Sequence, residues 1–237
     1  MISTQDIEYH QNKAIYRGFM AFDDTLPQPK PCVMIAHDWS GRNSFFCEKA
    51  KQLAAMGYVG FAVDLYGNAQ TGETTDEKKA LLESVISRRE NVAERFLAAF
   101  DKALTLRVVD PQKIAAIGYC FGGLAVLDLA RTGADVKGVI SFHGLLSAPE
   151  TRAACRIRSK ILALHGYDDP LVPPAQVEQF AAEMTAKKAD WQVHMYGHTQ
   201  HAFTNPMAND DKMGLHYNRE ADLRSWRSTE SFLAEIF

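Results

Sequence analysis

The sequence lacks the features that mark membrane, secreted and metal-binding proteins. No apolar run approaches the 18 or more residues of a membrane span. The four cysteines, at positions 32, 47, 120 and 155, form no C-x-x-C pair, which argues against a zinc ribbon or a dithiol redox centre. Residues 1–6 show no basic stretch leading into an apolar one, the pattern of a secretory signal. We therefore expect a cytoplasmic protein in which disulfides are rare.

An excess of either charge is missing as well. The net charge is −3 over 237 residues, which offers no electrostatic footprint for nucleic acid or an anionic membrane. Repeats, low-complexity tracts and linkers are also absent. Because 46% of the residues are apolar, the chain can bury a substantial core, and we expect one domain over residues 1–237. We expect a monomer or a weak homodimer.

What the sequence does contain is an alternation of short apolar runs and longer amphipathic segments. Residues 7–10 and 13–22 predict an amino-terminal hairpin. The runs typical of buried strands cover residues 32–36, 58–63, 113–117, 136–142, 160–164 and 191–196. Helical periodicity covers residues 44–56, 76–106 (in two pieces), 174–187 and 219–236. The alternation predicts an α/β fold with a doubly wound, mostly parallel sheet flanked by helices.

The most informative segment is the run Gly118-Tyr119-Cys120-Phe121-Gly122-Gly123. It follows one apolar run and precedes another, which predicts a strand, a sharp turn and a helix. This is the pattern of the nucleophile elbow of α/β-hydrolases, with cysteine in place of serine. Cys120 would lie at the amino end of the helix, where the helix dipole favours the reactive thiolate. The alternative is a turn of small residues around a buried, inert cysteine.

A cysteine nucleophile needs a base to take its proton and a third group to orient that base. In this fold the order along the chain is nucleophile, acid, histidine, each after a strand. The acid is then Asp168 or Asp169, and the histidine is His198 or His201. Spacing alone leaves both choices open.

Two further patterns in the same segments bear on chemistry. The backbone N–H of Phe121, the residue after the nucleophile, is expected to donate to the oxyanion, and the Trp39 amide is a plausible second donor. A metal site built from His194, His198 and His201 is the alternative for the histidines. Those three residues straddle a strand and a loop instead of sharing one helical face, which disfavours a metal.

With these residues in view, the sequence resembles the dienelactone hydrolase family over nearly its whole length. The resemblance rests on four motifs: the run 118–123, Asp64-Leu65-Tyr66, Asp169 followed by Pro170-Leu171-Val172-Pro173, and His201-Ala202-Phe203. It implies an α/β-hydrolase with a Cys-Asp-His triad of Cys120, Asp169 and His201. It implies no metal and no organic cofactor.

The sequence departs from the family at positions that bind the substrate. Family members that open dienelactones carry a glutamate beside the nucleophile, where this chain has the shorter Asp38. Aspartate also readily bonds its own local backbone. A family arginine after the histidine is replaced here by Asn205. A second family arginine falls in the long helical segment, where Arg88, Arg89 and Arg95 compete and Arg89 is our choice for substrate binding.

These inferences predict a hydrolase that cleaves a small-molecule ester or lactone through a thioester acyl-enzyme on Cys120. One alternative is a promiscuous carboxylesterase or thioesterase with an unrelated substrate. Another is a non-catalytic ligand-binding protein, since a fold does not determine a function.

Overall fold

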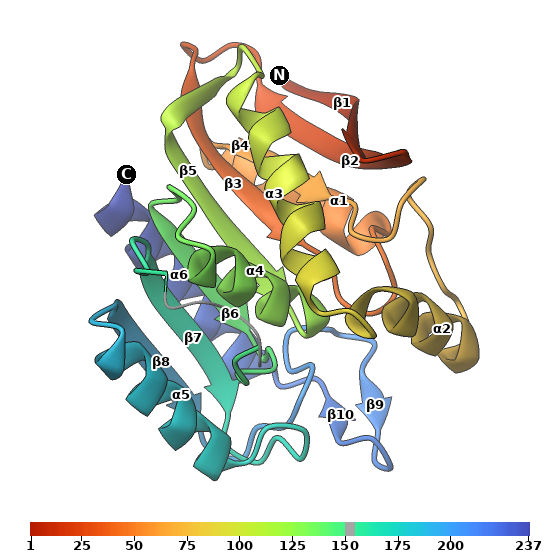
Figure 1. Ribbon diagram of the computed structural model, residues 1–237, viewed down its shortest axis with the longest axis vertical. Coiled ribbons are helices and arrows are strands. Elements are labelled where there is room, and N and C mark those ends of the chain that lie inside the picture. Colours follow the sequence, from red (N-terminus) through yellow and green to blue (C-terminus); the bar gives the residue numbers. More distant parts are fainter. Residues whose placement is uncertain (150–154) are drawn as a thin grey trace. The chain divides into compact units, whose positions relative to one another are not determined.

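The computed structural model describes residues 1–149 and 155–237 (Figure 1). The chain forms two compact units, residues 1–117 and 118–237. A single domain over residues 1–237 stays a prediction. In the described part of the chain, no helix combines the length and apolarity that a membrane crossing requires.

The first unit begins with the expected hairpin. β1 (Ile2–Gln11) and β2 (Ala14–Asp23) pair antiparallel along their whole length, and β2 also pairs antiparallel with β4 (Val59–Val63). β3 (Lys30–Ala36) runs parallel to β4, and β5 (Val109–Tyr119) completes the order β1-β2-β4-β3-β5. β4 is buried at every position, as a strand is when both faces of its sheet are covered.

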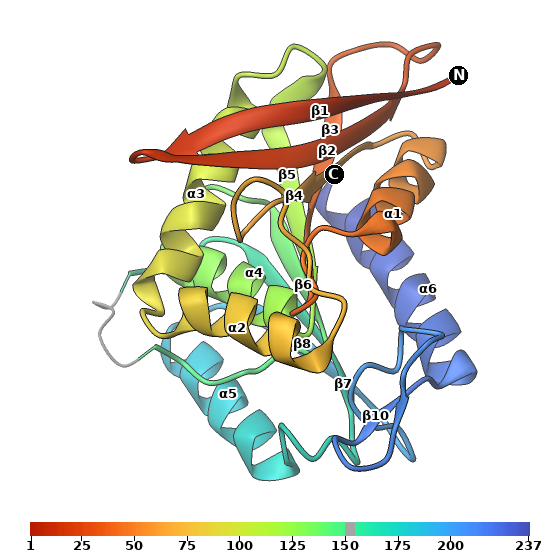
Figure 2. The same cartoon turned by 90° about the vertical axis from the view of Figure 1, so that its right-hand side faces the viewer.

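Three helices belong to the first unit: α1 (Ser44–Ala55), α2 (Thr75–Ile86) and α3 (Glu90–Leu104). The helical stretch that the sequence placed over 76–106 is indeed two helices. Thr74 and Glu77 form a capping box that begins α2, each side chain accepting a backbone N–H of the other residue. α1 and α3 cover opposite faces of this unit's strands (Figure 2).

The strands of the second unit are mostly parallel. β6 (Gly138–Phe142), β7 (Lys160–Gly166) and β8 (Asp190–Tyr196) lie side by side in that order, all in the same direction. The carboxyl ends of these strands therefore meet at one edge. A small antiparallel pair, β9 (Asn209–Asp210) and β10 (Leu215–His216), is not among the predicted elements, because two-residue strands leave no periodicity in a sequence.

The helices of the second unit cover both faces of these strands. α4 (Phe121–Arg131) and α5 (Pro174–Ala186) lie on one face, and α6 (Arg219–Ile236) lies on the other (Figures 1 and 2). Every residue of α4 is buried. A helix without a polar face belongs to a core, so α4 holds the residue before it, Cys120, in a fixed place.

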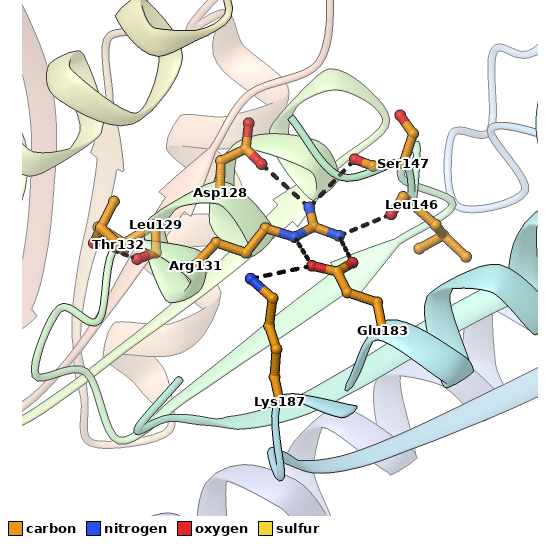
Figure 3. Close-up of polar contacts among 8 residues, drawn as sticks. All are labelled: Asp128, Leu129, Arg131, Thr132, Leu146, Ser147, Glu183 and Lys187. Atoms are coloured by element: carbon orange, nitrogen blue, oxygen red, sulfur yellow. Dashed lines mark hydrogen bonds and ion pairs between the residues drawn. The ribbon is translucent and has the colours of Figure 1, made fainter. Parts of the chain in front are cut away.

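A buried arginine ties α4 to α5 and to the loop after β6 (Figure 3). Arg131 is 1% exposed and donates to both carboxylate oxygens of Glu183, at 3.0 and 2.7 Å. It also donates to Asp128 at 3.1 Å and to the carbonyl oxygens of Leu146 at 2.9 Å and Ser147 at 3.4 Å. Removing one partner of such a buried pair costs about 3–5 kcal/mol, because the other charge is then left unpaired.

Candidate active site

Cys120 occupies the turn between β5 and α4 in a backbone conformation that few side chains adopt. Its φ of +53° lies in the left-handed region, which costs a residue with a Cβ about 1–3 kcal/mol. Three backbone hydrogen bonds hold the turn. The Cys120 N–H donates to the Phe142 carbonyl at 3.0 Å, and the Cys120 carbonyl accepts from Gly123 at 3.0 Å and Leu124 at 3.3 Å. Its side chain is half-buried.

Two glycines make this turn sterically possible. A Cβ on Gly118, at the end of β5, would overlap the carbonyl of Gly122 in α4. A Cβ on Gly123 would lie 2.6 Å from the Ser141 hydroxyl oxygen and 2.7 Å from the Gly144 Cα. Packing therefore requires glycine at both positions, because strand and helix approach closely there.

Asp169 and His201 lie together after β7 and β8. The Asp169 Oδ2 atom is 2.7 Å from the His201 Nδ1 atom, with both side chains at most 1% exposed. The second oxygen of Asp169 accepts the Leu171 N–H at 2.8 Å. The His201 backbone pairs with Gly214 and His216, which anchors the loop that carries the imidazole. The carboxylate is thus oriented toward Nδ1 and leaves Nε2 for another partner.

The rival residues from the sequence have different environments. Asp168 and His198 are exposed, and the Asp168 N–H donates to the Thr199 carbonyl at 2.9 Å. The structure therefore brings Asp169, not Asp168, to His201. A catalytic role for these two residues stays a prediction.

The charge of His201 is coupled to Cys120. Burial lowers the pKa of His201, but the Cys120 sulfur and the Asp169 carboxylate outweigh it and raise that pKa to about 10. Within the described residues, the His201 Nε2 atom is buried without a hydrogen bond of ordinary geometry.

Among the described residues, three histidines besides His201 are buried: His37 in the first unit, whose pKa burial also lowers, and two in the second unit that were not predicted. His143 follows β6, and His165 lies near the end of β7, where its Nε2 is 2.9 Å from the Val172 carbonyl oxygen. Burial lowers the pKa of both, and the positive charge of His201 lowers it further. Each stands before a glycine at the end of a predicted strand, and that repeated His-Gly pair is the signal that could have found them.

These neutral histidines predict a loss of stability below neutral pH. Their pKa in the folded protein lies below the ordinary 6.5, so the unfolded chain binds protons that the folded protein does not. The free energy of unfolding should then fall as the pH drops below about 6.5, by at most about 1.4 kcal/mol per pH unit for each histidine. Urea titrations at about pH 7 and about pH 5 would measure the decline.

The variant His165→Gln should show a smaller decline than the wild-type protein, because one of the two buried rings is gone. His10→Gln is the matched control, since His10 is an exposed residue on β1. It should keep the wild-type decline. Equal declines in all three proteins would contradict the assignment of these histidines as neutral.

Asp38 and Trp39 lie in the first unit, in the loop after β3. Asp38 Oδ1 accepts the Ser40 backbone N–H at 2.8 Å and also bonds the Ser40 hydroxyl. Asp38 thus bonds its local backbone, as aspartate commonly does. The Trp39 carbonyl accepts the Tyr66 hydroxyl at 2.9 Å. A contact of Asp38 with substrate and an oxyanion role for the Trp39 amide stay predictions.

The remaining predicted residues are Arg89 and Phe121. Arg89 directly precedes α3 and is half-buried, and its contact with substrate stays a prediction. Its rival Arg95 donates to the Leu65 carbonyl at 2.7 Å and lies over the Tyr16 ring, which assigns Arg95 a packing role. Phe121 is the first residue of α4, and oxyanion donation by its amide stays a prediction as well.

The histidines proposed as an alternative metal site do not gather. His194, on β8, is 3.1 Å from the Ser228 hydroxyl oxygen on α6. His198 is exposed, and His201 is bound to Asp169. Across residues 1–149 and 155–237, no three His, Cys, Asp or Glu side chains are grouped so as to hold a metal ion.

Comparison with known proteins finds similarity along most of the chain. Residues 17–237 match the dienelactone hydrolase family. The "Putative carboxymethylenebutenolidase" of Saccharolobus solfataricus is 27% identical over an alignment of 265 positions that covers 98% of each chain. The crystal structure of a dienelactone hydrolase-like promiscuous phosphotriesterase from metagenomic libraries is 33% identical, with a TM-score of 0.94 over 100% of this chain and 99% of that one.

A Klebsiella pneumoniae structure that is only 18% identical shares the fold over 99% of both chains, with a TM-score of 0.84. These similarities confirm the expected α/β-hydrolase fold. At the level of the family, they also confirm the expected enzyme class, a hydrolase of carboxylic ester bonds. The chain belongs to the dienelactone hydrolase family.

Proposed function

We propose that this protein hydrolyses a small-molecule carboxylic ester or lactone with Cys120 as its nucleophile. The observation that carries the proposal is the arrangement of His201, which bonds Asp169 through Nδ1 and is charge-coupled to the Cys120 sulfur. The strained turn at Cys120 adds support, since such strain recurs at catalytic nucleophiles. Family membership supports a hydrolytic reaction.

In the first half of the reaction, the Cys120 thiolate attacks the carbonyl carbon of the ester. The negative charge moves to the carbonyl oxygen, where the amides of Phe121 and Trp39 would stabilise it. One such donor is commonly worth a factor of about 10² to 10³ in rate. As the tetrahedral intermediate collapses, the C–O bond breaks and His201 gives its Nε2 proton to the leaving alkoxide. An alcohol departs and a thioester remains on Cys120.

In the second half, the now neutral His201 takes a proton from water, and the resulting hydroxide attacks the thioester carbon. The C–S bond breaks and the acid is released. Sulfur leaves as a thiolate, and His201 keeps the proton, so the starting ion pair is restored. Asp169 orients the ring and stabilises the imidazolium in both halves.

The residues predicted to bind the substrate argue against a ligand whose carboxylate is held by two arginines. Arginine binds a carboxylate by two parallel hydrogen bonds, and one family arginine is replaced here by Asn205. The Asn205 side chain accepts the Met207 N–H at 2.9 Å, so it serves its own loop. We infer a substrate held by fewer charged contacts. Arg89 and Asp38 are the residues proposed to contact it. No metal or organic cofactor enters the mechanism.

Acid quenching during turnover of an activated acetate ester should trap one acetyl group on the peptide that contains Cys120. Deacylation requires water to attack a thioester, so the adduct should accumulate in a burst with such esters. Mass spectrometry of the digested protein measures it. Cys155→Ser, which removes an exposed thiol, should leave the adduct in place. Steady turnover with no adduct, or with an adduct only elsewhere, would exclude the thioester intermediate.

Two alternatives stand beside the proposal, and one observation favours the first of them. The promiscuous phosphotriesterase at 33% identity suggests that a similar site accepts more than one ester class. A promiscuous carboxylesterase or thioesterase would show comparable kcat/KM for aryl esters, acyl thioesters, lactones and phosphotriesters, whereas a dedicated lactonase would favour lactones. A non-catalytic binding protein would turn over none of them.

A further inference from the structure

The loop after β6 carries a buried histidine that the proposed mechanism does not use. His143 is 3% exposed, and its φ of +39° lies in the left-handed region, where residues with a Cβ are uncommon. Its N–H donates to the Leu164 carbonyl at 2.8 Å, and the carbonyl just before it, on Phe142, accepts the Cys120 N–H at 3.0 Å. The backbone of His143 is therefore built into the turn that holds the nucleophile.

The side chain of His143 contacts the residues around the base. Its Nε2 atom is 2.8 Å from the hydroxyl of Thr204, which lies on the same loop as His201. The His143 ring packs edge-to-face against the His201 ring, with centroids 5.1 Å apart. It packs in the same manner against Phe203, also at 5.1 Å. One side chain thus touches the imidazole of His201 and is bonded to the loop that presents it.

The residues that directly follow His143 are held by neighbouring elements as well. Gly144 lies against α4, where a Cβ on Gly123 would come within 2.7 Å of it. The carbonyl of Leu146 accepts a hydrogen bond from the buried Arg131 at 2.9 Å (Figure 3). The elements that hold Cys120 therefore also hold His143. The His143 ring in turn packs against the His201 ring and so links the position of His201 to that of Cys120.

The charge of His143 suits a neighbour that must carry a proton during part of the proposed reaction. Burial lowers the pKa of His143 well below its ordinary value, and the charge of His201 lowers it further. The ring is neutral at working pH and does not repel the His201 imidazolium. A neutral, polar ring can also keep its bond to Thr204 without a desolvated charge, which would be costly.

We propose that His143 is a positioning residue that holds the His201 imidazole in register with Cys120, through ring packing and the bond to Thr204. The inference rests on the proposed function in one respect, that His201 is the base for Cys120. Because His143 is buried, it acts through His201 and not by touching the substrate. Its loss should lower kcat and leave KM nearly unchanged.

Three substitutions separate the two contacts of His143. His143→Phe keeps a ring but loses the bond to Thr204, Thr204→Val loses only that bond, and His143→Ala loses both. A misplacement of about 1 Å can cost a catalytic step about 10²-fold, so we expect kcat for an aryl ester to fall about 10- to 100-fold in His143→Ala. The other two should fall less. His143→Phe and Thr204→Val keep the inference testable if His143→Ala does not fold.

The deciding readout is alkylation of Cys120 by iodoacetamide across the pH range. All variants are made in a Cys155→Ser background, because exposed Cys155 would consume the reagent. If His143 positions His201, the pH profile of alkylation should shift upward and the rate near neutral pH should fall about 10-fold in His143→Ala, as the thiolate loses its partner. A purely structural residue would lower the melting temperature without moving this profile.

A matched control exists in the same unit. His194 bonds the Ser228 hydroxyl at 3.1 Å between β8 and α6, and neither residue belongs to the proposed machinery. His194→Phe and Ser228→Ala should leave both the alkylation profile and kcat unchanged. If His143 and Thr204 act through one bond, the double variant His143→Phe/Thr204→Val should lose no more than the worse single variant.

Unchanged alkylation profiles in the folded variants at His143 and Thr204 would overturn the inference. Alkylation requires no ester, so its outcome is independent of the proposed function. If the wild-type protein turns over no ester, the proposed function is wrong. If the alkylation profile nevertheless shifts in His143→Phe, the positioning role is supported. Normal ester turnover together with unchanged alkylation profiles would contradict the positioning role alone.

Discussion

Cys120→Ala should lower kcat for an activated aryl ester by about 10⁴-fold or more, to a rate close to background. The substitution removes the atom that would form the proposed thioester. Cys32 is fully buried, and burial raises the pKa of its thiol far above the ordinary value. Stopped-flow detection of the released aryl alcohol measures the loss. Circular dichroism checks that the variant is folded.

The remaining cysteines supply the controls. Cys155→Ala removes an exposed thiol and should keep wild-type kcat. Cys120→Ser is a sharper test, because a hydroxyl is a far weaker nucleophile unless a base removes its proton. A site tuned to a thiolate–imidazolium pair should leave the serine variant severely impaired. Turnover by folded Cys120→Ala at a rate near that of the wild type would end the thiol mechanism.

Asp169→Asn should lower kcat by about 10³- to 10⁴-fold while preserving the fold. The Asp169 carboxylate accepts the Nδ1 proton of His201 at 2.7 Å, and its negative charge helps to raise the pKa of His201. An amide removes that charge and can present an N–H to Nδ1, which favours the wrong tautomer of the ring. Steady-state kinetics with an aryl ester measures the loss.

The neighbouring residue provides a control of the same chemistry. Asp168→Asn makes an identical change one position earlier, on an exposed side chain. It should retain kcat within about 3-fold, since surface substitutions away from special features have small effects. If Asp168→Asn were the more damaging of the two, the assignment of the acid would be wrong.

Local patterns in the sequence were enough for the elements of the fold. The buried strand β4 reads as an apolar run, and α2 begins at a capping box visible as Thr74 and Glu77. The turn at Cys120 was also predictable from the small residues around it. In the structure, a Cβ on Gly118 or Gly123 would collide with neighbouring atoms. Each of these features depends on residues close together in the chain, so the sequence carries the whole signal.

The pairing of acid and base was beyond the reach of spacing. Asp168 and Asp169 are adjacent, and His198 and His201 are three residues apart, so each pair satisfies the order required after a strand. The resemblance to the family selected Asp169 and His201. In the structure the loop after β7 turns Asp169 inward, with its Oδ1 bonded to the Leu171 N–H, and leaves Asp168 exposed. Loop geometry, which has no periodic signal, makes that distinction.

The sequence by itself determined the longer strands and helices, their order and the turn at Cys120, because these depend on apolar periodicity and on small residues next to Cys120. The two-residue strands β9 and β10 leave no such signal. Only the tertiary structure decided which side chains surround His201. His143 lies 58 positions before His201 in the chain (201 minus 143), yet their ring centroids are 5.1 Å apart. Parallel strands bring residues so distant in sequence to one edge of a sheet. There, burial lowers the pKa of His143, while the Cys120 sulfur and the Asp169 carboxylate raise that of His201.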